Sequence, residues 1–322
     1  MSDTIAPTPR RILVIGSFGQ LGSELVPELV RRYGAGNVLA TDLKVRPLEY
    51  ATEQLDVMDK NRVMQFMRSY KFDVVYHLAA VLSATGEKLP AMAWDVNIQG
   101  LFHVLDTARA NQVKQIFWPS SMAVFGPHTP QEDTPQYCMM DPITVYGITK
   151  LTGELLAQYY HLRWGMDIRS LRYPGLISYK TPPTGGTTDY AVYMLQAAAK
   201  GQNYTSYIDA HTALPMMYMP DAIKATLNLM DAPAERIGIR TSYNLGAFSL
   251  TPAQLAESIR KHLPDFQVSY QPDFRQEIAE SWPNSLDDSA ARQDWGWQPD
   301  YDLDAMVRHM LVQYGAKLPA VV

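Results

Sequence analysis

Cysteine is the scarcest residue of this 322-residue chain, in which Cys138 is the only one. A single cysteine can form neither an intramolecular disulfide nor a cysteine zinc cluster, so a reducing compartment is the simplest expectation. The seven histidines show no His-x-x-x-His pattern, and we therefore expect no bound metal. We expect Cys138 itself to be an inert, half-buried thiol in a loop.

Long apolar runs and an excess of positive charge are also absent. No 18 apolar residues follow one another, which excludes an obvious membrane-spanning helix. Residues 1–10 have neither the apolar core of a signal peptide nor an arginine-rich amphipathic pattern, and we expect a short disordered lead-in. The formal net charge of −5 argues against a nucleic-acid or anionic-membrane surface. These absences favour a soluble cytoplasmic protein.

The first half of the chain alternates short apolar segments with helical patterns. Such an alternation predicts a parallel sheet covered by helices on both faces, with right-handed crossovers, which is the doubly wound α/β fold of the Rossmann type. The expected strands are 11–15, 37–41, 73–77, 115–119 and 167–173. The expected helices are 20–33, 61–69, 91–111 and 146–164.

The second half is less regular after about residue 176. Prolines and glycines cluster at 182–186, and helices are expected at 190–200, 221–230, 252–263 and 303–314. Thr251 as N-cap, Pro252 at N1 and Gln254 at N3 predict one helix start well. We expect a smaller substrate lobe interleaved with the sheet domain: residues 1–177 plus about 213–247 would bind a dinucleotide, and about 178–212 plus 248–322 the substrate.

A glycine-rich turn follows the first expected strand. Gly16 allows a tight turn, Gly19 lets the backbone approach a pyrophosphate at a helix N-terminus, and Gly22 permits close packing of helix on strand. Three spaced glycines are weak evidence alone, but their place between a strand and a helix favours a dinucleotide site. The segment runs Gly16-Ser17-Phe18-Gly19-Gln20-Leu21-Gly22.

An acidic residue ends the second expected strand. Asp42 lies 20 residues after Gly22, where a carboxylate accepts the ribose hydroxyls and repels a 2′-phosphate, so NAD is favoured over NADP. Lys44 and Arg46 could serve a 2′-phosphate, but solvated loop charges are the better interpretation after that acid. Further on, Asp56-Val57 could line the adenine pocket, and helix capping by Asp59 explains these acids almost as well.

Tyr146 and Lys150 are four residues apart in an expected helix and share one face. A nearby ammonium favours phenolate and would lower the pKa of the tyrosine, which makes it a usable general base. Such a pair also arises by chance in a tyrosine-rich chain. Ser120-Ser121 at the end of a strand, 25 residues before Tyr146, adds weight because open α/β sheets bind ligands at that rim.

The glycine turn, Ser121, Tyr146 and Lys150 together resemble the pattern of the extended short-chain dehydrogenase/reductase superfamily. That superfamily combines a Gly-x-x-Gly-x-x-Gly turn with a triad of a serine and the tyrosine and lysine of Tyr-x-x-x-Lys. The resemblance implies catalysis by Ser121, Tyr146 and Lys150. It also implies a helix asparagine that holds a proton-relay water and cofactor segments after two strands. These match Asn97, the segment Leu78-Ala79-Ala80, and Tyr173 in Leu171-Arg172-Tyr173-Pro174. We expect His77 to be a hydrogen-bonded structural histidine.

Stretches in both halves are similar to a family within this superfamily, the short-chain L-threonine 3-dehydrogenases. One departure is Ser17-Phe18 in the glycine turn, where smaller residues are expected. The similar stretches are 89–97, 172–178, 185–191, 214–222 and 281–283.

This resemblance implies oxidation of the C3 hydroxyl of L-threonine to 2-amino-3-oxobutyrate with NAD, without a metal. Tyr146 would take the hydroxyl proton, Ser121 would hydrogen-bond the same oxygen, and Lys150 would hold the nicotinamide ribose. Groups for the substrate's ammonium and carboxylate would come from Ser83, Thr187, Thr188, Asp189 and Trp282, the last of which could instead be a core residue. Thr187 or Thr188 is also a candidate cap for the helix that begins near Tyr190.

Two other functions stay open at this stage. A sugar-nucleotide epimerase or dehydratase needs cations for a pyrophosphate, and among Arg236, Arg240, Arg275 and Arg292 only Arg275 is a candidate, with a structural salt bridge as the equal alternative. A non-catalytic protein that senses NAD would commonly lack part of the triad, which this chain keeps. Family precedent suggests a homodimer through the helices at about 91–111 and 146–164.

Overall fold

The computed structural model describes residues 10–183, 185–316 and 318. The expected lead-in therefore lies almost wholly outside the described residues. Six parallel strands form the central sheet in the order β3-β2-β1-β4-β5-β7. Their bounds are β1 Ile12–Ile15, β2 Val38–Asp42, β3 Ala51–Gln54, β4 Val74–His77, β5 Gln115–Phe117 and β7 Asp167–Arg169. The strand order reverses between β1 and β4, which is where doubly wound sheets bind ligands.

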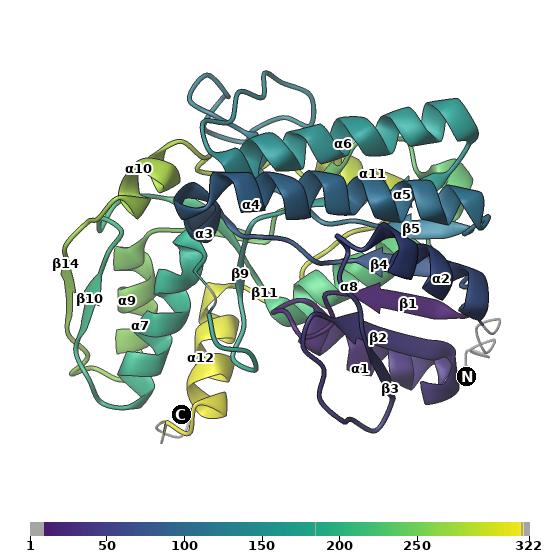
Figure 1. Ribbon diagram of the computed structural model, residues 1–322. Helices are drawn as coiled ribbons and strands as arrows, with labels where there is room; N and C mark the ends of the chain where they lie inside the picture. Colours follow the sequence, from purple (N-terminus) through teal and green to yellow (C-terminus); the bar gives the residue numbers. More distant parts are fainter. Residues whose placement is uncertain (1–9, 184, 317, 319–322) are drawn as a thin grey trace.

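Helices cover both faces of this sheet, as the sequence predicts (Figure 1). Alternate side chains of β1 point to opposite faces. Ile12 and Val14 pack in a core with α1 (Gly22–Tyr33) and α8 (Met219–Asp231), whereas Leu13 and Ile15 pack in a second core with α2 (Lys60–Tyr70), α5 (Gly100–Ala110) and α6 (Val145–Trp164). The expected cap of α2 is confirmed, since the Asp59 side chain accepts from the Arg62 amide.

The helix expected over 91–111 is not uniformly α-helical. It consists of α4 (Pro90–Trp94), a π-helical turn (Asp95–Gln99) and α5. The turn carries the buried Asn97, whose side chain accepts from the Val81 amide at 2.8 Å and donates to the Val81 carbonyl at 3.0 Å and to Thr149 Oγ1 at 3.0 Å. Pattern alone cannot reveal the extra residue in this turn, because π turns interrupt a helix without a fixed sequence signal.

The single strand expected over 167–173 is also wrong. The chain breaks at Ser170, so that β7 pairs with β5 while β8 (Leu171–Tyr173) pairs with β6 (Ser120–Ser121) and with β12 (Tyr243–Asn244). In this register Ser121 lies opposite Tyr173. The break therefore brings two of the expected site residues side by side.

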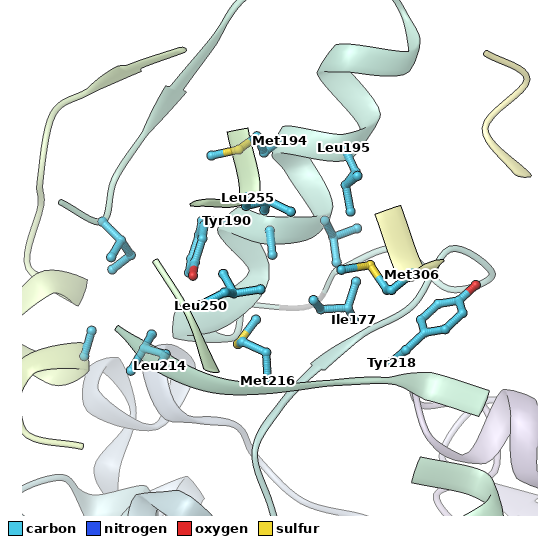
Figure 2. Close-up of a cluster of buried hydrophobic side chains, with 14 of the residues drawn as sticks. Ile177, Tyr190, Met194, Leu195, Leu214, Met216, Tyr218, Leu250, Leu255 and Met306 are labelled. Atoms are coloured by element: carbon cyan, nitrogen blue, oxygen red, sulfur yellow. The ribbon is translucent and has the colours of Figure 1, made fainter. Parts of the chain in front are cut away.

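The second half builds a smaller unit around the sheet β13-β11-β9. Figure 2 shows its core, in which Tyr190, Met194 and Met216 pack with side chains from α9 and α12. The capping box at Thr251 and Gln254 is confirmed as well. The elements are β9 Gly175–Ile177, α7 Tyr190–Ala199, β10 Tyr204–Ser206, β11 Leu214–Tyr218, β13 Phe248–Leu250, α9 Pro252–Arg260, β14 Val268–Tyr270, α10 Arg275–Glu280, α11 Ser289–Trp295 and α12 Leu303–Gln313.

The chain crosses between the two units more than once. After β9 it leaves the sheet side, β11 then pairs in parallel with β9, and α8 returns to the sheet. Trp295 and Trp297, at and beyond the end of α11, pack in the same core as α1 and α8. Among the described residues no helix combines the length and apolar character needed to cross a membrane.

Candidate active site

One pocket opens beside the carboxyl ends of β1 and β4, and both halves of the chain contribute to its wall. From the sheet side come Gly16, Gly19, Gln20, Leu21, Gly22, Leu78, Ala80, Leu82, Ser83, Pro119, Ser120, Ser121, Met122, Tyr146, Lys150, Tyr173, Pro174, Gly175 and Leu176. From the second half come Gly186, Thr187, Thr188, Asp189 and Trp282. All expected catalytic and substrate residues thus lie on one wall or another of this pocket, together with ten of the expected cofactor residues.

The glycine turn fits a dinucleotide phosphate. Gly16 has φ +82°, and a Cβ there would lie 2.5 Å from the Ala79 amide; a Cβ on Gly22 would lie 2.5 Å from the Gly16 carbonyl. A Cβ on Gly19 would meet only the Gly16 oxygen, at 3.5 Å, so this backbone faces open space on the pocket side. Within the described residues the buried side-chain nitrogen of Gln20, Nε2, has no hydrogen-bond partner, which leaves a donor in the pocket wall. Phe18, the departure from the family pattern, leaves this cradle intact.

The Asp42 side chain stabilises the glycine turn by a hydrogen bond to its backbone. Its Oδ2 accepts from the Phe18 amide at 2.9 Å and its Oδ1 from the Leu43 amide at 2.8 Å. The guanidinium of Arg46 lies over the Phe18 ring, 5.3 Å from the centroid. The carboxylate therefore stands at the end of β2 beside the glycine turn, where the sequence expects the adenosine ribose.

Five expected cofactor residues lie outside the lining of the main pocket: Asp42, Asp56, Val57, Ala79 and Asn97. Asp56 Oδ1 accepts from the Met58 amide and also lines a separate open groove with Asp59. Val57 is buried against Gly100, and the Asn97 side chain is taken up by Val81 and Thr149. Asn97 thus holds the segment that carries Ala80 and Leu82 into the pocket.

Tyr146 and Ser121 face each other in the pocket. Burial raises the pKa of Tyr146 to about 12, and a hydrogen bond with Ser121 acts in the opposite direction. The Ser121 hydroxyl also accepts from the Ala123 amide at 3.2 Å, which fixes its place at the end of β6. The Thr144 hydroxyl accepts from the Gly147 amide and starts α6 two residues before Tyr146.

The sequence predicts that Lys150 lowers the pKa of Tyr146, but burial and the hydrogen bond with Ser121 determine that pKa instead. The Lys150 ammonium lies over the rings of Trp118 and Tyr146, 4.7 and 5.5 Å from the centroids, and donates to the Pro119 carbonyl at 2.6 Å. Burial lowers the pKa of Lys150 itself to about 7, against an opposing effect of the Glu154 charge. The ammonium is thus desolvated and directed at a carbonyl rather than at the phenol, which is why burial dominates the pKa of Tyr146.

His77 is buried at the end of β4, and the expectation of a hydrogen-bonded histidine is wrong. Among the described residues neither ring nitrogen has a partner. Burial, and secondly the charge of Lys150, lower the pKa of His77 to about 3. The imidazole is therefore neutral at physiological pH and packs below the pocket as an uncharged ring.

The segment Gly185–Asp189 forms a compact turn at the mouth of α7. The carboxylate of Asp189 accepts from the Gly185 amide at 3.1 Å and from the Gly186 amide at 2.7 Å. Within the described residues no side chain caps α7, whose N-cap residue is Asp189, so the expected capping by Thr187 or Thr188 is wrong. A 3₁₀ turn over Thr187–Asp189 precedes α7 and directs both threonines at the pocket.

The threonines and Trp282 connect this turn to the sheet side. The hydroxyls of Thr187 and Ser83 are 3.3 Å apart, and a Cβ on Gly175 would meet the Thr188 side chain at 2.7 Å. Trp282 is buried in the core of the second half, as the alternative expects, and it also lines the pocket.

Several lining residues carried no distinct signal in the sequence. Met122 directly follows Ser120-Ser121, and extending that motif by one position would have found it. Leu82 and Leu176 are apolar residues whose place follows only from the tertiary fold.

The remaining candidates lie away from the pocket or are paired. Arg275 forms an ion pair with Asp273, as the structural alternative expects. Cys138 is half-buried, and burial raises the pKa of its thiol. Within the described part of the chain, no group of three or more His, Cys, Asp or Glu side chains could hold a metal ion.

A doubly wound sheet, a glycine turn at its switch point and a Ser, Tyr, Lys constellation on the same rim define a nucleotide-dependent oxidoreductase-type site. Residues 12–246 match the model of the NAD dependent epimerase/dehydratase family, and the chain belongs to that family. An "Uncharacterized epimerase/dehydratase" of Staphylococcus epidermidis is 46% identical over 309 residues, covering 94% of this chain and 96% of that protein.

Solved structures of similar sequence include three threonine dehydrogenases. A partial consensus L-threonine 3-dehydrogenase is 50% identical, with a TM-score of 0.93 over 95% of this chain and 100% of that chain. The holo form of a GalE-like L-threonine dehydrogenase from Cupriavidus necator is 50% identical, with a TM-score of 0.92 over 94% and 99%. A monomeric L-threonine 3-dehydrogenase from a metagenome database, in its apo form, is 46% identical, with a TM-score of 0.92 over 94% and 98%.

Proposed function

We propose that this protein is an NAD-dependent L-threonine 3-dehydrogenase that converts L-threonine to 2-amino-3-oxobutyrate. The observation that carries the proposal is the single pocket in which Tyr146, Ser121 and Lys150 face Thr187, Thr188, Asp189, Ser83 and Trp282. The similar solved structures described as threonine dehydrogenases support the same choice of substrate.

In this proposal Tyr146 is the general base. It takes the proton of the C3 hydroxyl while Ser121 donates a hydrogen bond to the same oxygen. Because burial raises the pKa of Tyr146 to about 12, the phenol needs help to lose its proton near neutral pH. The hydrogen bond between Tyr146 and Ser121 supplies part of that help, since a hydrogen bond to the charged form favours the phenolate.

The glycine turn is proposed to hold NAD. The Gly19 backbone and the side-chain amide of Gln20 would bind the pyrophosphate. Asp42 would bind the adenosine ribose, and Asp56 and Val57 would line the adenine pocket. When bound, the nicotinamide supplies the hydride acceptor. Tyr173 and the Leu78-Ala79-Ala80 segment would contact the nicotinamide ring, and Lys150 would bind the nicotinamide ribose.

The second half is proposed to bind the amino-acid end of threonine. Asp189 provides a buried carboxylate beside two glycine amides, and this charge suits a substrate ammonium. The hydroxyls of Ser83, Thr187 and Thr188 suit the substrate carboxylate. Trp282 closes the apolar side, where the threonine methyl group would lie.

A sugar-nucleotide epimerase or dehydratase is less well supported, because among the described residues no arginine of the second half lines the pocket. All four candidates have other contacts: Arg236 with the Gln293 carbonyl, Arg240 with Asp167, Arg275 with Asp273 and Arg292 with Asp288. A pyrophosphate in the substrate half would lack the cations that it needs. A non-catalytic NAD sensor is disfavoured because Ser121, Tyr146 and Lys150 share one pocket.

We propose that the lobes divide as the sequence suggests, with residues 1–177 plus about 213–247 for the cofactor and about 178–212 plus 248–322 for the substrate. Trp295 and Trp297 are the exception, because they belong to the second set of ranges but pack in the core of the sheet domain.

We also propose a cytoplasmic homodimer. The helices α5 and α6 lie side by side (Figure 1). They expose apolar side chains: Phe102, Leu155, Tyr159, Leu162 and Trp164. An exposed apolar face of this kind is typical of a protein interface. One of the similar solved proteins is described as monomeric, so the state of this chain needs its own measurement.

The test of the function mixes the protein with NAD and either L-threonine or a UDP-sugar, and follows NADH absorbance from neutral to alkaline pH. The proposal expects NADH with L-threonine alone. No rise with L-threonine at any pH would refute it, and turnover of the UDP-sugar would favour the alternative.

A further inference from the structure

Glu154 is a fully buried acid that the proposed chemistry does not use. It lies one helical turn after Lys150 on α6, with its side chain 0% exposed. The Arg172 guanidinium donates to both of its oxygens, from Nε at 2.9 Å and from Nη2 at 2.8 Å. The Ser120 hydroxyl donates to Oε1 at 2.6 Å. Charged groups are rarely buried so completely without a role that offsets their desolvation.

Each partner of Glu154 adjoins a group of the active site. Ser120 lies between Pro119, whose carbonyl accepts from Lys150 Nζ at 2.6 Å, and Ser121. Arg172 pairs with Ser120 in the register of β6 and β8. One carboxylate therefore joins the helix that carries Tyr146 and Lys150 to the two strands that carry Ser121 and Tyr173.

Arg172 extends these contacts toward the substrate half. Its Nη1 donates to the Gln136 carbonyl at 2.9 Å and to Asn244 Oδ1 at 3.0 Å. The Asn244 amide in turn donates to the carbonyls of Thr134 and Asp287. The ion pair is thus anchored on three further segments, and its own position is fixed by them.

We propose that Glu154 is a positioning residue, which holds the Pro119 carbonyl and the Ser121 hydroxyl in place against Lys150 and Tyr146. This inference rests on the proposed dehydrogenase function. Without Glu154 the Ser120 hydroxyl of β6 loses its acceptor on α6, and the acceptor of the Lys150 ammonium is free to shift.

The charge of Glu154 also acts on Lys150. The groups that face Lys150 within the described residues are Tyr146 and Glu154 on its own helix, His77 of β4, and the ring of Trp118. Burial lowers the pKa of Lys150 to about 7 while the negative Glu154 opposes that fall. Loss of the carboxylate leaves desolvation unopposed, so Lys150 gives up its proton at lower pH.

The test replaces the whole pair by Glu154→Leu with Arg172→Met. A single substitution would leave one buried charge unpaired and risk unfolding, whereas an apolar pair of similar volume is often tolerated. We expect a native-like melting temperature, a KM for NAD within about threefold of native, a kcat at least about tenfold lower, and an alkaline limb of the pH profile displaced downward by about half a unit or more.

The control is Asp167→Leu with Arg169→Met, which removes an ion pair between a buried arginine and a partly exposed aspartate of β7, away from the pocket; Asp167 also pairs with Arg240. This variant is expected to alter stability alone. The inference is overturned if the Glu154 and Arg172 double variant keeps the native kcat and alkaline limb, or if the control loses as much kcat.

A readout independent of turnover separates this inference from the proposed function. In protein labelled with ¹³C-lysine, the Lys150 resonance is assigned by its loss in Lys150→Met. It should titrate at lower pH in the Glu154 and Arg172 double variant than in the native protein, whether or not L-threonine is a substrate. An unchanged titration overturns the inference, whereas absence of threonine oxidation by the native protein refutes the proposed function only.

Discussion

At the scale of single residues, the buried carboxylate of Asp189 combines two tasks. It closes the Gly185–Gly186 turn through their amides, and it lies in the pocket wall, where the proposed function places the substrate ammonium. A carboxylate can close a turn and also bind a ligand, because it has several acceptor sites. The turn and the pocket therefore depend on the same charge.

We predict that Asp189→Asn raises the KM for L-threonine by about tenfold or more, because it replaces a charged hydrogen bond to the ammonium by a neutral one. The KM for NAD should not change. Asp209→Asn is the control, since Asp209 accepts from the His211 amide in a comparable turn outside the pocket. Initial rates at varied threonine give both constants. Native threonine kinetics in Asp189→Asn would reduce Asp189 to a loop cap.

The pKa of Lys150 predicts a pH dependence of stability. Its value in the folded protein, about 7, lies below the ordinary 10.5, so between these values the unfolded chain binds a proton that the folded one has released. Stability then rises with pH above about 7, by at most about 1.4 kcal/mol per pH unit for this one proton. Below pH 7 the cost of burying the charge is fully present.

Denaturant unfolding of native protein and Lys150→Met at pH 7 and pH 9, without cofactor, measures this effect. The native protein should gain stability relative to the variant as pH rises, since other titrating groups cancel in the comparison. An equal difference at both pH values would show that Lys150 is not desolvated in the folded state.

At the scale of elements, the glycine turn between β1 and α1 separates packing from ligand approach. Gly22 meets the Gly16 carbonyl, whereas Gly19 faces open space on the pocket side. The sequence distinguishes these glycines by their place in the motif, and the structure shows the different surroundings of each.

We predict that Gly22→Ala destabilises the fold by about 1–3 kcal/mol, because its Cβ would overlap backbone atoms. Gly19→Ala should keep the native stability but raise the KM for NAD by about tenfold or more, since the methyl group occupies the approach of the pyrophosphate. Gly36→Ala, whose Cβ meets nothing within 4 Å, is the control for both. Unfolding curves and NAD titrations report the two effects. A normal KM for NAD in Gly19→Ala would contradict the cofactor position.

The elements also show what sequence reasoning can reach. Continuous apolar runs placed strands such as β1, which is buried on both faces, and helical periodicity placed helices such as α1, which buries one face. The π turn at Asn97 and the break at Ser170 escaped it, because each is set by tertiary hydrogen bonds and strand pairing. Three-residue strands such as β10 and β14 are too short to leave a periodic signal.

For the candidate site, motifs identified residues but not their electrostatics. Spacing put Tyr146 and Lys150 on one face, yet the desolvation that lowers the pKa of Lys150 depends on the surrounding rings and strands. The unpartnered ring of His77 and the turn-closing role of Asp189 likewise follow only from the folded structure.

At the scale of the whole molecule, the exposed apolar face of α5 and α6 predicts self-association. Leu162 is 77% exposed and Leu155 55% exposed on α6, and burying such side chains between two copies would stabilise a dimer.

Light scattering should give twice the mass of one chain, and Leu162→Glu should return it to the mass of a monomer. Val312→Glu on α12, at a similarly exposed position, is the control that should stay dimeric. A native protein that scatters as a monomer at all concentrations would refute the dimer without affecting the proposed chemistry.

The central claim is that this pocket removes hydride from C3 of L-threonine, with Tyr146 as the base. The most direct measurement uses L-threonine that carries deuterium at C3, and mass spectrometry of the NADH formed. We predict one deuterium in each NADH and a turnover about 10²–10⁴-fold lower in Tyr146→Phe of native fold. NADH without deuterium, no NADH at all, or native turnover in Tyr146→Phe would contradict the account.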